Sequence, residues 1–324
     1  MLYKPFSKMI KHYLTPLSYN LIKSYRDKYI MPPVDDTSYF SDAISDPDNA
    51  ATIISEAITS DTPCMISRLG IVELDATLCF QKGVPLSFLR KCLPFWVGEC
   101  TKMKMQDNAG FFPISNSMLS RFSDLMFSII PEIDIITIFR AVESLAIRHN
   151  CLKIRAPYLE PFWSKVPWTV QLNGKKVLVI HPFAESIRKQ YVRRELLFDN
   201  GDILPEFASL TIIKAVQSIG GETNGFNSWF EALHYMESEI DKVDYDVALI
   251  GCGAYGMPLA AHCKKMGKKA VHLGGALQLL FGIRGNRWET EQDIYKQFMN
   301  EHWIRPLESE RPKAAQKVEN ACYW

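Results

Sequence analysis

The chain has 324 residues, of which 47% are hydrophobic and 23% charged, as is typical of a soluble globular protein made of one large domain or two smaller ones. Its formal net charge of +1 excludes an overall positive field that would attract nucleic acid. The eight cysteines form no C-x-x-C pair, which argues against structural zinc, and with no recognisable signal peptide they fit a reducing cytoplasm.

The first 30 residues predict a basic amphipathic helical arm. Six basic residues oppose one acid, Asp27, and alternate with apolar and aromatic residues; they are Lys4, Lys8, Lys11, Lys23, Arg26 and Lys28. Such a segment can bind reversibly to an anionic membrane surface, or it can pack as an arm on the body or on another subunit. A linker rich in Pro and Asp follows. We therefore divide the chain into an arm with its linker (1–47), an α/β domain (48–307) and a polar tail (308–324).

Apolar runs alternate with helical patterns through the rest of the chain. The predicted strands are residues 64–67, 133–139, 177–180, 210–215, 247–250 and 270–273. The predicted helices are residues 48–60, 71–81, 115–129, 186–198, 227–240, 257–266 and 290–301. This alternation predicts a mostly parallel, Rossmann-like sheet with helices on both faces, in which ligands bind at the carboxyl ends of the strands.

The turn after the first predicted strand contains Arg68, Gly70 and Glu73. An arginine at a strand end can hold a phosphate with its planar fork of donors. Glu73 opens the following helix and can act as a carboxylate base or bind a ribose or a metal ion. Alternatively, Glu73 complements the helix dipole and pairs with Arg68.

The turn after the third predicted strand contains His181 and Ser186. Ser186, at the start of a helix, can bind phosphate together with the backbone N–H groups there. His181 can donate a hydrogen bond or act as an acid or base. The alternative is a buried histidine with satisfied hydrogen bonds and a solvated basic face on the helix.

Two glycine-rich turns follow the last two predicted strands. Gly251, Gly253 and Gly256 surround Tyr255, and Gly274 and Gly275 form the second turn. The first turn matches the G-x-G-x-x-G pattern, but the acid expected about 20 residues later is absent, since that position falls near His272. We interpret the turns as a cradle for a nucleotide or sugar phosphate; the alternative is close packing of a strand on a helix through glycine.

Two further segments supply polar side chains. A basic loop with Arg284, Arg287 and Trp288 could close over a diphosphate or could be a solvated loop. Asn108 lies beside apolar residues and could line an acceptor pocket, unless those residues only precede the next helix as a hydrophobic staple.

The turn R-x-G-x-x-E at Arg68, Gly70 and Glu73, with the late segment I-G-C-G-A-Y-G…H-L-G-G, resembles bacterial glycosyltransferases of the GT-D fold. The resemblance covers roughly residues 64–288. It implies a nucleotide-sugar donor and a role in surface polysaccharide or glycan assembly. The family motif is usually R-F-G-D-G-E; here Ile71 stands where the aspartate would be, so we expect weak or absent dependence on Mn²⁺ or Mg²⁺.

The sequence thus predicts a cytoplasmic glycosyltransferase, peripheral to the inner face of the membrane, that transfers a sugar to a lipid-linked or other glycan acceptor. Arg68, Arg284 and Arg287 would neutralise the leaving group, and Glu73 or His181 would activate the acceptor hydroxyl. Two alternatives stay open: a nicotinamide-dependent oxidoreductase that uses the glycine turn, and a non-catalytic member of a polysaccharide assembly complex.

Overall fold

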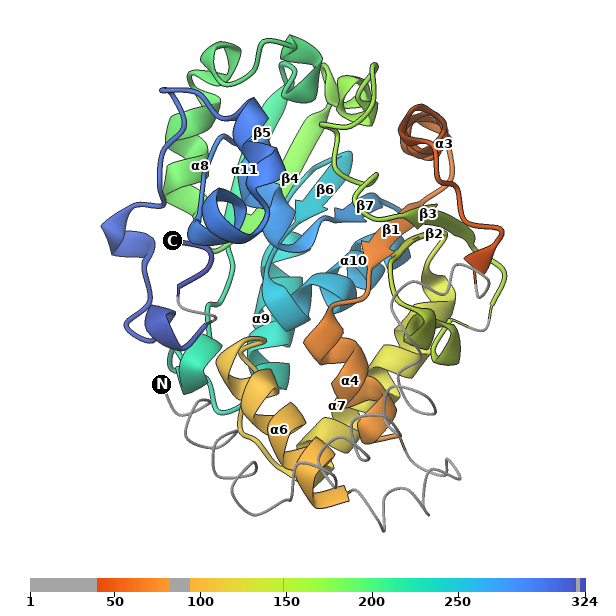
Figure 1. Ribbon diagram of the computed structural model, residues 1–324, viewed down its shortest axis with the longest axis vertical. Coiled ribbons are helices and arrows are strands. Elements are labelled where there is room, and N and C mark those ends of the chain that lie inside the picture. The colour runs from red at the N-terminus through yellow and green to blue at the C-terminus, as the bar shows by residue number, and fades with distance from the viewer. Residues whose placement is uncertain (1–39, 82–93, 148, 319–320) are drawn as a thin grey trace.

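The computed structural model describes residues 40–81, 94–147, 149–318 and 321–324 and confirms the predicted parallel α/β architecture (Figure 1). Within this described part the sheet has seven strands, all parallel, in the order β3-β2-β1-β7-β6-β4-β5. The strands are β1 (Cys64–Arg68), β2 (Ile135–Ile138), β3 (Leu152–Arg155), β4 (Lys176–His181), β5 (Ser209–Lys214), β6 (Val247–Ile250) and β7 (Lys269–His272). In sequence order, β1–β3 form one side of the sheet and β4–β5 the other, and the last two strands, β6 and β7, lie between these two sides.

Alternating apolar side chains place one hydrophobic core on each face of the sheet. In β4, Val177 and Val179 belong to one core, and Leu178 and Ile180 belong to the other. All four are at most 1% exposed. Because both faces of the central strands are covered, these strands read as continuous apolar runs, and this is what made them recognisable in the sequence.

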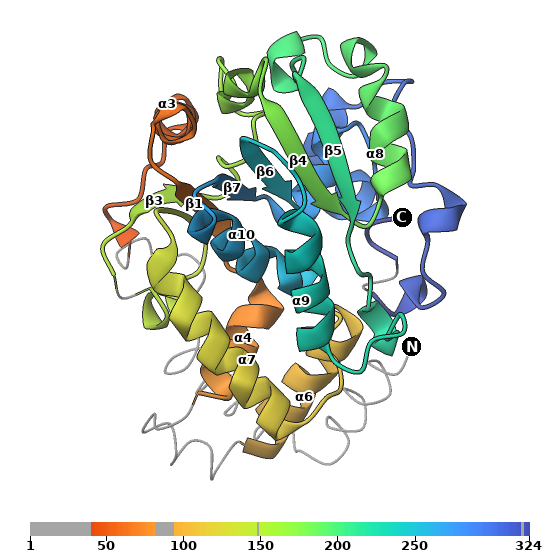
Figure 2. The ribbon, with the colours of Figure 1, turned by 180° about the vertical axis from the view of Figure 1, so that it is seen from behind.

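Helices cover both faces (Figure 2). Helices α4 (Ile71–Cys79), α7 (Asn116–Ile129), α9 (Trp229–Ile240) and α10 (Gly256–Lys265) contribute to one core, and α6 (Pro94–Asp107) packs on α4. Helices α3 (Pro47–Thr59), α8 (Ala184–Tyr191) and α11 (Leu277–Leu280) contribute to the other. Serine side chains cap two of them: Ser115 accepts from the N–H of Met118, and Ser228 accepts from that of Glu231.

The structure corrects the predicted elements at four places. Strand β3 and helix α6 were not predicted. The predicted helix at 290–301 is instead a π-helical turn, Arg287–Glu291, followed by a 3-10 segment, Asp293–Phe298. Helix α8 ends at Tyr191 because the hydrogen bonding changes there to the 3-10 pattern, with the N–H of Arg193 bonded to the carbonyl of Gln190 at 3.0 Å.

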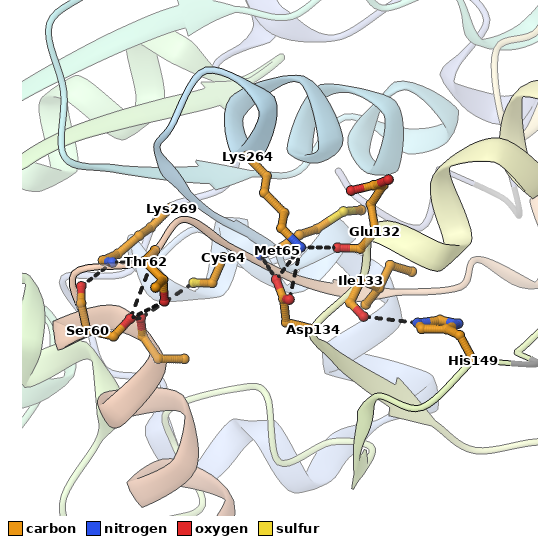
Figure 3. Close-up of polar contacts among 11 residues, drawn as sticks. Ser60, Thr62, Cys64, Met65, Glu132, Ile133, Asp134, His149, Lys264 and Lys269 are labelled. Carbon is orange, nitrogen blue, oxygen red and sulfur yellow. Dashed lines mark hydrogen bonds and ion pairs between the residues drawn. The ribbon is translucent and has the colours of Figure 1, made fainter.

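Polar contacts tie together the amino-terminal edge of the sheet, opposite the predicted ligand edge (Figure 3). Asp134 accepts a hydrogen bond from the N–H of Met65 at 2.7 Å and pairs with Lys264 at 2.9 Å. Lys269 donates to the carbonyl oxygens of Ser60 and Thr62. These contacts join β1, β2 and β7 to their flanking segments, and we assign them a structural role.

The predicted arm at residues 1–30 lies outside the described residues. Within the described ranges, no helix combines the length and the apolar character needed to cross a bilayer. Residues 308–320 were predicted to form a loose polar segment, whereas the sequence left open whether the last four residues dock. Glu310 instead binds the start of α8, and the last residues, from Ala321 to Trp324, pack beside α11.

Candidate functional site

A cavity of about 1000 Å³ opens at the carboxyl ends of the strands. Each of the seven strands in the described sheet contributes a lining residue at its end or just beyond it: Arg68, Phe139, Ala156, His181, Val216, Gly251 and His272. Parallel α/β sheets bind their ligands at this edge. Its volume lies at the upper end of the roughly 300–1,000 Å³ that small-molecule sites occupy.

Most of the predicted site residues line this cavity. They are Arg68, Gly70, Glu73, Asn108, His181, Gly251, Gly253, Tyr255, Gly274, Gly275 and Arg287. The three others, Ser186, Gly256 and Arg284, are not among its lining residues. The strand-end turns therefore come together as the parallel topology requires.

The two glycine turns approach each other closely. A Cβ atom on Gly251 would lie 2.6 Å from the carbonyl oxygen of Gly274 and 2.9 Å from the His181 ring. Gly274 has a φ of +62°, in the left-handed region that favours glycine, and it also packs against the Arg68 side chain. Gly251 thus lets the first glycine turn pack closely on the second, and residues of both turns line the cavity.

Gly256 has a different role from the one that the G-x-G-x-x-G pattern suggested. A Cβ atom there would lie 2.2 Å from Nε2 of His272. His272 is 6% exposed, and its Nδ1 is 3.1 Å from the Ser67 hydroxyl oxygen. Gly256 thus allows α10 to pack against the end of β7, which is the packing alternative left open by the sequence.

Arg68 connects the second glycine turn to the rest of the cavity. Its Nη1 donates to the carbonyl oxygen of Leu273 at 3.4 Å, and its side chain contacts Gly274. Its positive charge lowers the pKa values of Glu160 and His272, although burial has the larger effect on both groups. The guanidinium therefore supplies positive charge at the ends of β1 and β7, which pair within the sheet.

His181 is a neutral hydrogen-bond donor rather than a base. Its Nδ1 accepts a hydrogen bond from the N–H of Phe183 at 3.0 Å, so the proton of the neutral ring lies on Nε2. Burial lowers the pKa of His181 to about 3, which keeps the ring neutral at physiological pH. Of the two predicted roles for His181, the geometry supports hydrogen-bond donation.

Glu73 lies in the first turn of α4, and its carboxylate folds back toward Gly70. A Cβ atom on Gly70 would lie 2.0 Å from Oε2 of Glu73, so the carboxylate sits over the first residues of its own helix. This position complements the helix dipole. Glu73 also lines the cavity, so both interpretations made from the sequence are compatible with its position.

The start of α8 already holds an anion from the same chain. Glu310 accepts hydrogen bonds from the backbone N–H groups of Glu185 and Ser186 and from the Ser186 hydroxyl. A carboxylate thus occupies the position predicted for a phosphate at Ser186. Arg284 in turn faces Glu289, with Nε 3.6 Å from Oε1, outside the cavity lining.

The C-terminal residues hold Arg287 at the cavity. Its Nη1 donates to the Tyr323 hydroxyl at 3.1 Å, and its guanidinium lies 4.7 Å from the centroid of the Tyr323 ring. Its backbone N–H donates to the carbonyl of Cys322 at 2.9 Å. Tyr323 also packs on Gly275, where a Cβ atom would lie 2.6 Å from the ring. Tyr323 and Trp324 both line the cavity, which the sequence did not predict.

A second group of lining residues was also missed: Glu160, Trp163 and Tyr295. The Tyr295 hydroxyl and Nε1 of Trp163 both donate to Oε2 of Glu160, the latter at 3.3 Å. Burial raises the pKa of Glu160, while the Tyr295 hydrogen bond and the Arg68 charge lower it. Glu160 follows β3, so recognition of that strand would have nominated it as a strand-end residue.

No protein-family model, curated protein or solved structure matches the chain. Among the residues that the structure describes, no three His, Cys, Asp or Glu side chains gather in a way that could ligate a metal ion. Ile71, where the resembled family has an aspartate, is 46% exposed and lines the cavity without supplying a ligand atom.

Proposed function

We propose that this chain is a glycosyltransferase that binds a nucleotide-sugar at the carboxyl edge of its sheet. The observation that carries the proposal is the convergence, in one cavity of about 1000 Å³, of two glycine turns, two arginines and four carboxylates. The arginines are Arg68 and Arg287, and the carboxylates are those of Glu73, Glu160, Glu291 and Asp293. A nucleotide-sugar needs both kinds of side chain close together, because arginines can bind its diphosphate and carboxylates can accept hydrogen bonds from its sugar hydroxyls.

The diphosphate would lie on the glycine turns. Gly253 lines the cavity, and only one atom, at 3.5 Å, lies near the position of its missing Cβ, so a ligand can approach that backbone closely. Arg68 beside Gly274 supplies a guanidinium for the phosphate oxygens. Arg287, held by Tyr323, would supply a second cation from the other side. Together they would neutralise the charge that develops on the leaving nucleoside diphosphate.

The reaction would join an acceptor hydroxyl oxygen to the anomeric carbon of the sugar as the bond from that carbon to the phosphate oxygen breaks. A cavity carboxylate would take the hydroxyl proton. His181, with its proton on Nε2, would donate a hydrogen bond to an oxygen of the donor. We propose a glycan or lipid-linked acceptor, with the enzyme in the cytoplasm at the membrane's inner face and its product used in surface polysaccharide synthesis.

A nicotinamide-dependent oxidoreductase is the less favoured candidate. The G-x-G-x-x-G pattern would need an acid to hold the adenosine ribose about 20 residues later. That place is taken by His272, which is buried, bonded to Ser67 and packed against Gly256. Gly256 itself is used for packing, so two elements of the dinucleotide pattern are engaged within the protein.

Thermal-shift screening tests the proposal. UDP-, GDP-, CMP- and dTDP-sugars and NAD(P) are compared on the wild type, on Arg68→Gln and on Arg188→Gln, a matched control whose side chain is 55% exposed on α8. We expect at least one nucleotide-sugar to raise the melting temperature of the wild type and the control but not of Arg68→Gln. A response to NAD(P) alone would refute the proposal, and binding without transfer to any acceptor would favour the non-catalytic alternative.

A further inference from the structure

We infer that Glu160 accepts a hydroxyl hydrogen bond from the sugar of the donor and thereby makes the site favour a nucleotide-sugar over the bare nucleoside diphosphate. The inference rests on the proposed function and assigns the sugar to a particular part of the cavity. That part is the pocket of Glu160, Trp163 and Tyr295, which we call the Glu160 subsite. Glu160 and Trp163 follow β3 in the chain, and Tyr295 comes from the 3-10 segment Asp293–Phe298.

The carboxylate of Glu160 is held by one oxygen only. The Tyr295 hydroxyl and the Trp163 indole N–H both donate to Oε2. Among the described residues none donates a hydrogen bond to Oε1, and Glu160 lines the cavity. Two donors on one oxygen fix the orientation of the carboxylate, and the second oxygen is left for a ligand.

A sugar hydroxyl has the chemistry that this oxygen needs. Burial disfavours the charged carboxylate and raises the pKa of Glu160. A hydrogen bond from a neutral donor to Oε1 would offset that cost without adding a competing charge. Phosphate, the other group of the donor, has only acceptor oxygens near neutral pH and would repel the carboxylate, so it belongs elsewhere in the cavity.

Arg68 relates the Glu160 subsite to the phosphate cradle. Its side chain contacts Gly274 and bonds to the carbonyl of Leu273, and its charge acts on both Glu160 and Tyr295. A phosphate held by Arg68 at the second glycine turn therefore brings its sugar toward Glu160. The aromatic rings of Tyr158, Trp163 and Tyr295 line this part of the cavity and offer apolar surface to the C–H faces of a sugar ring.

The experiment compares two ligands on each variant by calorimetry: the nucleotide-sugar with the largest thermal shift and the corresponding nucleoside diphosphate. The measured quantity is the affinity ratio of the two. We expect Glu160→Ala to reduce this ratio by about tenfold or more while the diphosphate affinity stays within a factor of two, because a hydrogen bond to a charged group is lost. Glu308→Gln, whose wild-type side chain is 87% exposed, is the control.

A pH series separates this role from a structural one. The ratio should fall as the pH drops through the raised pKa of Glu160, because the protonated group is a weaker acceptor. Tyr295→Phe removes a hydrogen bond that lowers this pKa, so the fall should begin at a higher pH in that variant. An unchanged pH profile in Tyr295→Phe, or an unchanged affinity ratio in Glu160→Ala, would overturn this inference but not the proposed function.

The outcomes distinguish this inference from the proposed function. If the nucleotide-sugar and the diphosphate bind and only the ratio is insensitive to Glu160, the diphosphate cradle survives and the Glu160 subsite is wrong. If neither ligand binds the wild type, both proposals fail. If both affinities fall together in Glu160→Ala, Glu160 supports the whole cavity rather than the sugar, and the inference is again overturned.

Discussion

Replacing Gly256 by alanine tests whether the third glycine of the G-x-G-x-x-G pattern serves packing or a ligand. Gly256 has helical backbone angles, with φ at −59°, so an alanine there meets no backbone strain. The new Cβ would nevertheless lie 2.2 Å from Nε2 and 2.4 Å from Cδ2 of His272. The imidazole is buried and bonded to Ser67, so it has little room to move away.

The magnitude follows from two opposing effects. Alanine is favoured over glycine inside a helix by about 1 kcal/mol. Overpacking of a buried contact costs about 1–3 kcal/mol, and a contact as short as this one falls at the upper end. We therefore expect Gly256→Ala to lower the free energy of unfolding by about 1–2 kcal/mol. In a His272→Ala background the clash is gone, so the same change should be neutral or stabilising by up to about 1 kcal/mol.

The assay is a double-mutant cycle in denaturant unfolding, with the wild type, both single variants and the double variant. His272→Ala destabilises by itself because it leaves a cavity and removes the partner of Ser67, but that cost cancels in the cycle. We expect a favourable coupling of about 2 kcal/mol between the two substitutions. An effect of Gly256→Ala that is the same in both backgrounds would refute the packing explanation.

Three further predictions concern residues that sequence analysis did not nominate. Burial raises the pKa of Glu143 from 4.5 to about 6, so ionising this group lowers the stability of the wild type as the pH rises through that range. The Glu143→Gln variant has no such group. The difference in unfolding free energy between variant and wild type should therefore shift by about 2 kcal/mol in favour of the variant between pH 4 and pH 7. Glu310→Gln removes a buried anion from the start of α8 and should cost about 1–2 kcal/mol, seen as a lower melting temperature; an unchanged value would contradict the role of Glu310. Tyr323→Phe keeps the ring but removes the hydroxyl that binds Arg287, so nucleotide-sugar affinity should fall about 2–10-fold in calorimetry while stability changes by less than about 1 kcal/mol.

The strands of the sheet could be recognised from the sequence where both faces are covered. The central strands β4, β6 and β7 are continuous apolar runs followed by turn residues. The edge strand β3 reads Leu-Lys-Ile-Arg, and only Ile154 is buried, so its pattern is too short and too polar to be distinguished from a loop. Helix α6 was missed for a related reason, since its segment Pro94–Asp107 contains lysines, a glycine and no clear apolar stripe.

The candidate site was predictable to the extent that it consists of strand ends. Arg68, His181 and Gly251 follow recognised strands, and the parallel topology alone brings them to one edge. Glu160 follows an unrecognised strand, and Tyr323 reaches the cavity from the chain's last described segment through contacts of long sequence separation. Local patterns carry no information about such contacts, so these two residues became candidates only in the structure.

The errors at Ser186 and Gly256 have a common physical cause. A helix start indicates that backbone N–H groups need a hydrogen-bond acceptor, and a glycine indicates that another atom approaches the backbone closely. Neither pattern says whether that acceptor or atom belongs to a ligand or to the protein itself. At Ser186 the partner is Glu310, and at Gly256 it is His272. Gly251 likewise faces the carbonyl oxygen of Gly274, and Gly274 faces the Arg68 side chain, but there the turns border an open cavity.

The connectivity of the sheet ties the candidate site to the global fold. Strand β7 pairs with β1 on one side and β6 on the other, so Arg68 and Gly274 meet only when segments about 200 residues apart in sequence are both folded. Arg287 depends in addition on the C-terminal residues. A ligand that bridges Arg68, Gly274 and Arg287 therefore binds the folded chain and not the unfolded one. It should raise the melting temperature in proportion to the logarithm of its concentration above the dissociation constant, which is why thermal shift is a direct measure of occupancy at this site.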